Sequence, residues 1–256
     1  MKQQGPAFWF QWVLATGLAF GFSSLTTGGL IRIAVVTTTQ VDPHDTFVSP
    51  LLWIAYIALA LLLGIAILTF AQWLALRTFL RELASLRWLA SSISGLAISL
   101  ASILLVGVLL VICLLASVAV EGPRDYTPYA ETMLLIFVAT AYVILGWISL
   151  WVGIAYKQWF VLQRYISSGS QRWHSWAFAT AAGGTVAGIV SFVLLASQTS
   201  RMYGTSGPLD TSNLGPGVLA LTGVIAGVVH GAITGFALYR LLRADIIPTV
   251  EQNETT

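Results

Sequence analysis

Six long apolar segments constrain the fold of this 256-residue chain more than any other feature. They cover residues 12–36, 51–76, 88–120, 133–162, 176–196 and 217–242. A helix of about 20 apolar residues crosses the roughly 30 Å hydrocarbon core of a bilayer, and each segment reaches that length. Charged residues make up only 9% of the chain, whereas soluble domains carry about 25%. The sequence therefore predicts an all-α integral membrane bundle of six transmembrane helices.

The connections between these segments indicate a single transmembrane domain over residues 1–256, with a short polar tail at 244–256. Residues 37–50, 121–131 and 197–216 contain the Pro, Gly and polar residues that are typical of loops. The first apolar stretch, 8–36, exceeds the roughly 7–15-residue core of a signal peptide, so we interpret it as a membrane helix. The only cysteine, Cys113, excludes an intramolecular disulfide and is predicted to be a buried core residue.

The distribution of basic residues predicts the orientation of the helices. Nine of the 12 Lys and Arg residues fall on the side shared by both termini: Lys2, Arg77, Arg81, Arg87, Lys157, Arg164, Arg172, Arg240 and Arg243. The other side has only Arg32, Arg124 and Arg201. Because basic loops stay in the cytoplasm, both termini are predicted to be cytoplasmic. No basic run suggests a nucleic-acid partner.

Two short sequence boxes recur along the chain and predict three hairpin repeats. The first helix of each pair opens with Trp followed four residues later by Ser or Thr, as in Trp12–Thr16, Trp88–Ser92 and Trp176–Thr180. The second helix closes with Gln72-Trp73-Leu74-Ala75-Leu76-Arg77, then Gln158-Trp159-Phe160-Val161-Leu162-Gln163, then a degenerate Gly235-Phe236-Ala237-Leu238-Tyr239-Arg240. The repeats cover about residues 8–80, 84–165 and 172–243 and run in the same sense. Such repeats predict pseudo-threefold packing about an axis along the membrane normal.

The boxes fall at the predicted cytoplasmic interface of the bilayer. Trp rings favour the headgroup region and Arg side chains reach the phosphates, so the boxes predict an anchoring belt. Its members are Trp12, Gln72, Trp73, Arg77, Trp88, Gln158, Trp159, Trp176 and Arg240. The alternative is a ligand site formed by the Gln and Trp side chains.

The Gln-Trp-x-x-Leu-Arg box, followed about 15 residues later by a Trp-x-x-Ser/Thr box, resembles a group of uncharacterised polytopic membrane proteins. These proteins are common in cyanobacteria and other filamentous phototrophs, and the resemblance extends over nearly the whole chain. It implies a bacterial inner membrane or a photosynthetic membrane as the setting, and it implies no mechanism.

Small residues recur every fourth position in several of the predicted helices. The sharpest stripe is Gly223, Gly227, Gly231 and Gly235, and a shorter one runs through Thr180, Gly184 and Gly188. Such stripes let two helix backbones approach closely in a membrane, where packing replaces the hydrophobic effect between helices. The partner is either another helix of the same chain or a second subunit.

His230 is the only ionisable side chain near the middle of a predicted span. Ionisable residues inside the membrane are costly and indicate a functional position. Three interpretations stay open: a neutral imidazole bonded to a Ser or Thr, an axial ligand of haem or chlorophyll, and a proton relay or substrate contact. Neither His44 nor His174 is placed at a matching depth, so a bis-histidine haem within one chain is not expected.

Two functions are compatible with these patterns. The first is a non-catalytic membrane subunit or scaffold that packs against other membrane chains, pigments or a second copy of itself. The scarcity of buried charge favours this function. The alternative is a transporter or channel for a small neutral solute, a class that usually has broken helices or charged residues at mid-membrane, where this chain has only His230 and hydroxyl groups. No nucleophile, acid and base occur in register, so an enzyme is not predicted. Lipids of the bilayer are the certain partner.

Overall fold

The computed structural model describes residues 5–39, 48–80, 83–121, 128–165, 173–203 and 215–244, and its described part is all-α as predicted. Side chains are described within the ranges 6–37, 51–80, 83–112, 136–165, 173–198 and 215–243. The helices are α1 (Gly5–Thr39), α2 (Val48–Arg77), α3 (Ser85–Glu121), α4 (Pro128–Leu162), α5 (Trp173–Tyr203) and α6 (Pro216–Ala244). The polar tail after residue 244 and the side chain of Cys113 lie outside these ranges.

All six helices are long and apolar enough to cross a membrane, which confirms the predicted number of spans. Each helix is longer than its apolar segment, because the backbone stays helical where the side chains become polar. The predicted end of the fifth helix at Ala196 is therefore wrong, since α5 continues to Tyr203. At about 1.5 Å per residue the 37 residues of α3 exceed the roughly 30 Å hydrocarbon core, so this helix tilts or projects beyond it.

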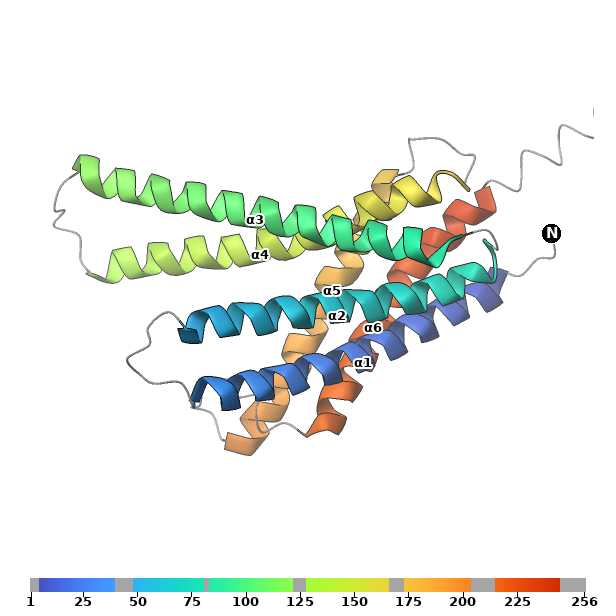
Figure 1. Cartoon of the computed structure of the whole chain (residues 1–256), viewed down its shortest axis with the longest axis horizontal. Coiled ribbons are helices and arrows are strands. Elements are labelled where there is room, and N and C mark those ends of the chain that lie inside the picture. The colour runs from blue at the N-terminus through green and yellow to red at the C-terminus, as the bar shows by residue number, and fades with distance from the viewer. Residues whose placement is uncertain are drawn as a thin grey trace, which may run out of the picture.

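The helices form a ring in chain order. Each helix packs against the next one in the sequence, and α6 packs against α1, so the ring closes between the two ends of the chain. The pairs α1–α2 and α3–α4 run side by side, while α5 and α6 cross behind them (Figure 1). The first turns of α1 and the last turns of α6 share one hydrophobic cluster, so they lie at the same end of the bundle.

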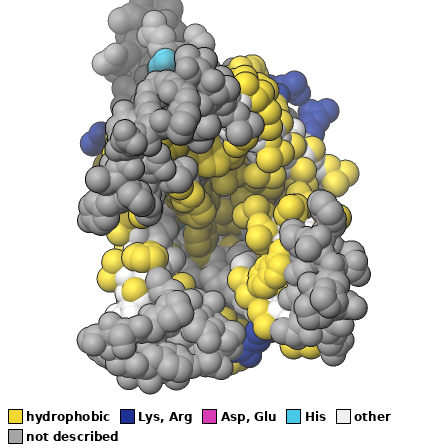
Figure 2. Space-filling view, turned by 90° about the vertical axis from the view of Figure 1, so that its left-hand side faces the viewer, with side chains coloured by type: hydrophobic (Ala, Val, Ile, Leu, Met, Phe, Trp, Pro, Cys, Tyr) yellow, Lys and Arg dark blue, Asp and Glu magenta, His cyan; other side chains and the backbone are white. Residues whose placement is uncertain are grey.

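The two ends of the bundle differ. At the end that we call the narrow end, all six helices contribute to one cluster of buried residues, which includes Phe8, Leu76, Leu162 and Leu241. At the opposite, wide end the α3–α4 pair diverges from the α1–α2 pair (Figure 1). Seen from the wide end, the centre of the bundle is hollowed and lined by hydrophobic side chains (Figure 2). The bundle is therefore shaped like a funnel that is closed at the narrow end.

Candidate functional site

The glycine stripe of α6 lies against α1 of the same chain. A Cβ atom added at Gly227 would sit 2.6 Å from the Phe20 Cβ and 2.7 Å from the backbone oxygen of Thr16. On the other helix, a Cβ added at Gly21 would sit 2.6 Å from a methyl group of Val224. The two backbones are thus in contact, and the stripe is already occupied within the chain.

The other small residues mark the remaining close crossings. A Cβ added at Gly95 of α3 would lie 2.5 Å from the backbone oxygen of Gly153 on α4. Ser99 fills the adjacent space and donates a hydrogen bond of 2.9 Å to the Ser149 carbonyl oxygen. On α5, Gly184 is covered by the Trp151 ring of α4. Small residues therefore position α4 between α3 and α5.

The predicted anchoring belt is wrong for four of its tryptophans, because their side chains are buried inside the bundle and do not face the headgroups. These are Trp12 at 0% exposure, Trp88 at 0%, Trp159 at 4% and Trp176 at 1%. The helices converge at the narrow end, and the indole rings fill the space between them. A tryptophan near a helix end gives the same sequence pattern whether it faces headgroups or neighbouring helices.

Other members of the predicted belt stay near the surface. Arg77 and Arg240 are exposed, and their guanidinium groups lie over the rings of Trp73 at 5.4 Å and Phe236 at 4.6 Å. Trp73 is half-buried and donates a hydrogen bond of 2.9 Å to the backbone oxygen of Leu83. The boxes thus combine buried rings with exposed cations.

Behind the Trp rings lies a small internal cavity with polar walls, which we call the polar chamber. It is lined by Ile65, Leu68, Thr69 and Gln72 of α2, Trp151, Ile154 and Gln158 of α4, Trp176 and Thr180 of α5, and His230 and Thr234 of α6. Its volume is about 10 Å³. This is close to the minimum of about 10–15 Å³ that holds one ordered water molecule.

Hydrogen bonds fix several side chains around this chamber. The Gln158 Nε2 donates to the Ser92 Oγ at 2.9 Å, which ties α4 to α3. The Trp12 Nε1 donates to the Thr234 Oγ1 at 3.0 Å, and this hydroxyl in turn donates to the His230 carbonyl oxygen at 2.8 Å. The wall of the chamber is therefore preorganised by contacts from α1 and α3 as well.

His230 is buried at the centre of the bundle. Its ring lies 4.7 Å from the Trp151 ring and 5.3 Å from the Phe20 ring. Its Nδ1 faces α5, where a Cβ added at Gly183 would lie 3.0 Å away. This nitrogen has no hydrogen-bond partner among the described residues. The His230 Nδ1 therefore does not form the predicted hydrogen bond with a Ser or Thr of the described residues.

Four polar atoms of the chamber residues are buried without a partner within the described part of the chain. They are the Gln72 Oε1, the Trp151 Nε1, the Trp176 Nε1 and the His230 Nδ1. Leaving a buried donor or acceptor unpaired costs about 1–3 kcal/mol, and native proteins keep few such groups. Four such atoms from four different helices around one cavity indicate that another molecule, such as water, completes their hydrogen bonding.

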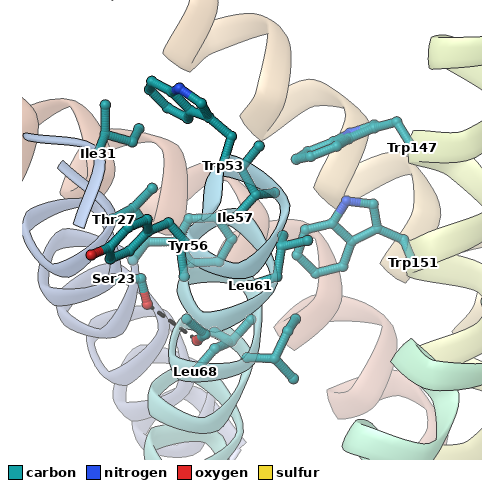
Figure 3. A pocket seen from close by; sticks show the side chains of 14 residues that line it. Ser23, Thr27, Ile31, Trp53, Tyr56, Ile57, Leu61, Leu68, Trp147 and Trp151 are labelled. Carbon is teal, nitrogen blue, oxygen red and sulfur yellow. Dashed lines mark hydrogen bonds between the residues drawn. The ribbon is translucent and has the colours of Figure 1, made fainter. Parts of the chain in front are cut away.

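A larger, apolar cavity lies next to the chamber toward the wide end. It has a volume of about 350 Å³ and is formed by α1, α2 and α4. Trp53, Tyr56 and Leu61 project into it from α2, and Trp147 and Trp151 face them from α4 (Figure 3). We call it the wide-end cavity. Its volume falls in the range of about 300–1,000 Å³ that is typical of small-molecule sites.

Three residues line both spaces and form the boundary between them: Ile65, Leu68 and Trp151. Trp151 is buried, and its indole edge lies against Gly184 of α5. One wall of the wide-end cavity also holds Ser23, which donates a hydrogen bond of 3.2 Å to the Gly64 carbonyl oxygen (Figure 3). The apolar wide-end cavity is thus separated from the polar chamber by these three side chains.

No family model, curated protein or solved structure matches this chain. The arrangement of the two cavities is therefore the basis on which a function is argued.

The predicted haem or chlorophyll ligation through His230 does not fit this geometry. An axial ligand needs room for the tetrapyrrole in front of its ring nitrogen, but the His230 Nδ1 faces the α5 backbone at Gly183 and the chamber volume is only about 10 Å³. Among the described residues, no group of three or more His, Cys, Asp or Glu side chains is placed to hold a metal ion.

The sequence pattern predicts a functional position at His230 but not the chamber around it. Gln72 and Gln158, which the pattern places at the membrane interface, are 4% and 3% exposed and line the chamber together with Trp176. The available sequence signal is the recurrence of polar residues in the boxes: Gln72 and Gln158 hold one equivalent position, and Thr16, Ser92 and Thr180 hold another. All five are buried in the structure. The structure thus places side chains from the boxes in the interior, as in the alternative of a Gln and Trp ligand site.

Proposed function

We propose that this chain is a non-catalytic membrane protein of the transporter class that binds a small, uncharged amphiphilic molecule between its helices. The observation that supports this most directly is the set of unpartnered buried polar atoms beside an apolar cavity. The apolar body of the ligand occupies the wide-end cavity, and its polar head displaces Trp151 enough to reach the chamber. In the absence of ligand, one water molecule occupies the chamber.

The chemistry of the two spaces selects for a neutral ligand. Among the residues that the structure describes, no Asp, Glu, Lys or Arg lines either the wide-end cavity or the chamber. A charged head without a counterion in such surroundings is strongly disfavoured. The free atoms include a donor at the Trp176 Nε1 and an acceptor at the Gln72 Oε1. A head that both donates and accepts while staying uncharged, such as a hydroxyl or an aromatic amine, matches them.

The proposal includes three same-sense hairpin repeats as the origin of the chamber. The equivalent box residues Trp12, Trp88 and Trp176 are all buried, and so are Thr16, Ser92 and Thr180. The pairs α1–α2, α3–α4 and α5–α6 are each in contact, as hairpins require. Three hairpins arranged about one axis bring their equivalent polar residues close to that axis. Boxes that are far apart in the sequence therefore contribute to one site.

We further propose that the narrow end faces the cytoplasm of a bacterium, as the distribution of basic residues predicts. The wide-end cavity then opens toward the opposite side of the membrane. A green fluorescent protein fused after residue 256 tests this orientation, because it fluoresces only when it folds in the cytoplasm. A dark, full-length fusion contradicts the assignment.

Binding can be tested with 1-aminoanthracene, an uncharged planar molecule with one amine. We expect saturable energy transfer from the protein tryptophans to this probe when the full chain is purified in detergent. Leu61→Trp fills the wide-end cavity and should abolish the saturable signal. Its neighbour Leu62 is exposed on the same helix, so Leu62→Trp adds the same donor ring and should bind like the unmodified chain.

Two further variants keep this test informative. Thr27→Phe fills the cavity from α1 and should reproduce the loss if Leu61→Trp fails to fold. Gln72→Leu removes the free acceptor of the chamber and should weaken binding by about 5- to 10-fold, the equivalent of about 1–1.5 kcal/mol for one hydrogen bond. Equal saturable binding to Leu61→Trp, Thr27→Phe and Leu62→Trp overturns the proposed site.

The function of a membrane subunit remains the second candidate, and a different observation favours it. The wide-end halves of α3 and α4 stand apart from α1 and α2 (Figure 1) and expose large apolar residues such as Leu104, Phe137 and Val143. The two helices are held together by Tyr142, which donates a hydrogen bond of 2.5 Å to the Ile103 carbonyl oxygen. Stoichiometric co-purification of another membrane chain, lost when Phe137 and Val143 become Ser, would support it.

A further inference from the structure

A second site lies on the outside of the bundle at the narrow end, away from both internal cavities. It is a groove between the start of α5 and the end of α6, with a volume of about 540 Å³. Its lining includes Ser175 and Phe178 of α5 and Ile233, Phe236 and Arg240 of α6. This groove is independent of the proposed function.

The polar and apolar parts of the groove follow one another along the axis of α6. Arg240 and Ser175 lie near the ends of their helices. Ile233 lies seven residues before Arg240, which places it about 10 Å deeper along α6. The groove thus begins with a cation and a hydroxyl at the membrane surface and continues as an apolar channel toward the bilayer centre.

The aromatic walls of the groove are open to lipid. Phe178 is 76% exposed and Phe236 is 50% exposed, and the Arg240 guanidinium lies 4.6 Å from the Phe236 ring. None of the described groove residues is acidic, so no carboxylate from the lining neutralises Arg240. Arg243 is also exposed and lies one turn further along α6, which adds a second positive charge near the same end.

We propose that this groove binds an anionic phospholipid of the bilayer, with the phosphate at Arg240 and one acyl chain along Phe178, Phe236 and Ile233. A guanidinium forms bidentate hydrogen bonds with phosphate oxygens, and basic pockets between membrane helices favour anionic headgroups. The Ser175 hydroxyl provides a further donor to the headgroup. An apolar helix of another protein would leave Arg240 without an anionic partner. An anionic phospholipid matches both the positive charge of Arg240 and the order of polar and apolar residues along the groove.

The proposal can be tested by native mass spectrometry of the full chain after delipidation. The probes are phosphatidylglycerol and phosphatidylcholine with identical acyl chains, titrated separately. We expect the first phosphatidylglycerol to bind more tightly than the first phosphatidylcholine. Arg240→Gln should weaken phosphatidylglycerol binding about 5-fold, as expected for one basic residue near the membrane surface, and should leave phosphatidylcholine binding unchanged.

Arg87→Gln is the matched control, because Arg87 is exposed near the start of α3 and does not line the groove. Ala237→Trp fills the groove while leaving both arginines, and it should reduce phosphatidylglycerol binding without changing thermal stability. Equal effects of Arg240→Gln and Arg87→Gln would show a general charge effect and overturn the site. Equal binding of the two lipids to the unmodified chain, or competition by inorganic phosphate alone, would overturn it too.

Discussion

The contact between α1 and α6 gives the sharpest test of the structure, through the variant Gly227→Ala. The added methyl group would sit 2.6 Å from the Phe20 Cβ, 2.7 Å from the Thr16 oxygen and 2.9 Å from the Gly17 Cα, all short of the 3.4 Å at which ordinary contact begins. Two of these atoms belong to the backbone of α1. They cannot rotate away, so the helices must separate to accept the methyl group.

The expected magnitude follows from two opposing effects. Overpacking of this kind destabilises a protein by about 1–3 kcal/mol, while Ala in place of Gly within a helix stabilises it by about 0.5–1 kcal/mol. Gly29 on α1 provides the matched control, because nothing lies within 4 Å of a Cβ added there. Gly29→Ala has only the second effect. The two variants should therefore differ by about 1–3 kcal/mol in unfolding free energy.

The assay is thermal unfolding of the purified chain in one detergent, followed by circular dichroism. A change of 1 kcal/mol shifts the melting temperature of a domain of this size by about 2–4 °C. Gly227→Ala should thus melt at least about 2 °C below Gly29→Ala, and Gly227→Leu should fail to give a monodisperse protein. If Gly227→Ala and Gly29→Ala melt at the same temperature, α6 does not pack against α1 as described.

Three further predictions concern other crossings. Gly184→Ala should lower the melting temperature more than Gly188→Ala, because a Cβ at position 184 would overlap the Trp151 ring, whereas one at 188 would lie 3.2 Å from the Trp147 ring, where a shift of a few tenths of an ångström relieves the contact. The reverse order would contradict the packing of α4 on α5. Tyr142→Phe should lower the unfolding free energy by about 0.6 kcal/mol, measured by denaturant titration, since it removes the bond to Ile103; an unchanged midpoint would argue against that bond. Ser92→Ala should cost about 1–3 kcal/mol by leaving Gln158 unpaired, and adding Gln158→Leu should recover part of this loss; additive losses in the double variant would refute their pairing.

The six helices were predictable because hydrocarbon imposes a minimum length of apolar sequence, which is visible without any knowledge of packing. The faces of those helices were not predictable in the same way. Leu14 is exposed and Trp12 is buried on one helix, although both are apolar. In a membrane the lipid-facing and core-facing sides are equally hydrophobic, so no periodicity separates them.

The candidate site could be predicted only in part for a related reason. His230 was recognisable because an ionisable residue is rare within a span. Gln72 and Gln158 lie near helix ends, where a polar residue is ordinary, so their burial depends on the convergence of the helices at the narrow end. The stripe through Gly227 indicated a close contact, but its partner α1 is separated from it by most of the chain.

Closure of the ring between α1 and α6 has a consequence for how the protein is made. Because α1 is synthesised before α6, its most extensive helix contact can form only after the four helices between them have been made. Until then the grooved face of α1, with Gly17 and Gly21, is exposed to lipid or to chaperones. Biogenesis of this protein therefore depends on holding an unfinished bundle together, and a nascent chain that stops before residue 216 should be a substrate for membrane proteases.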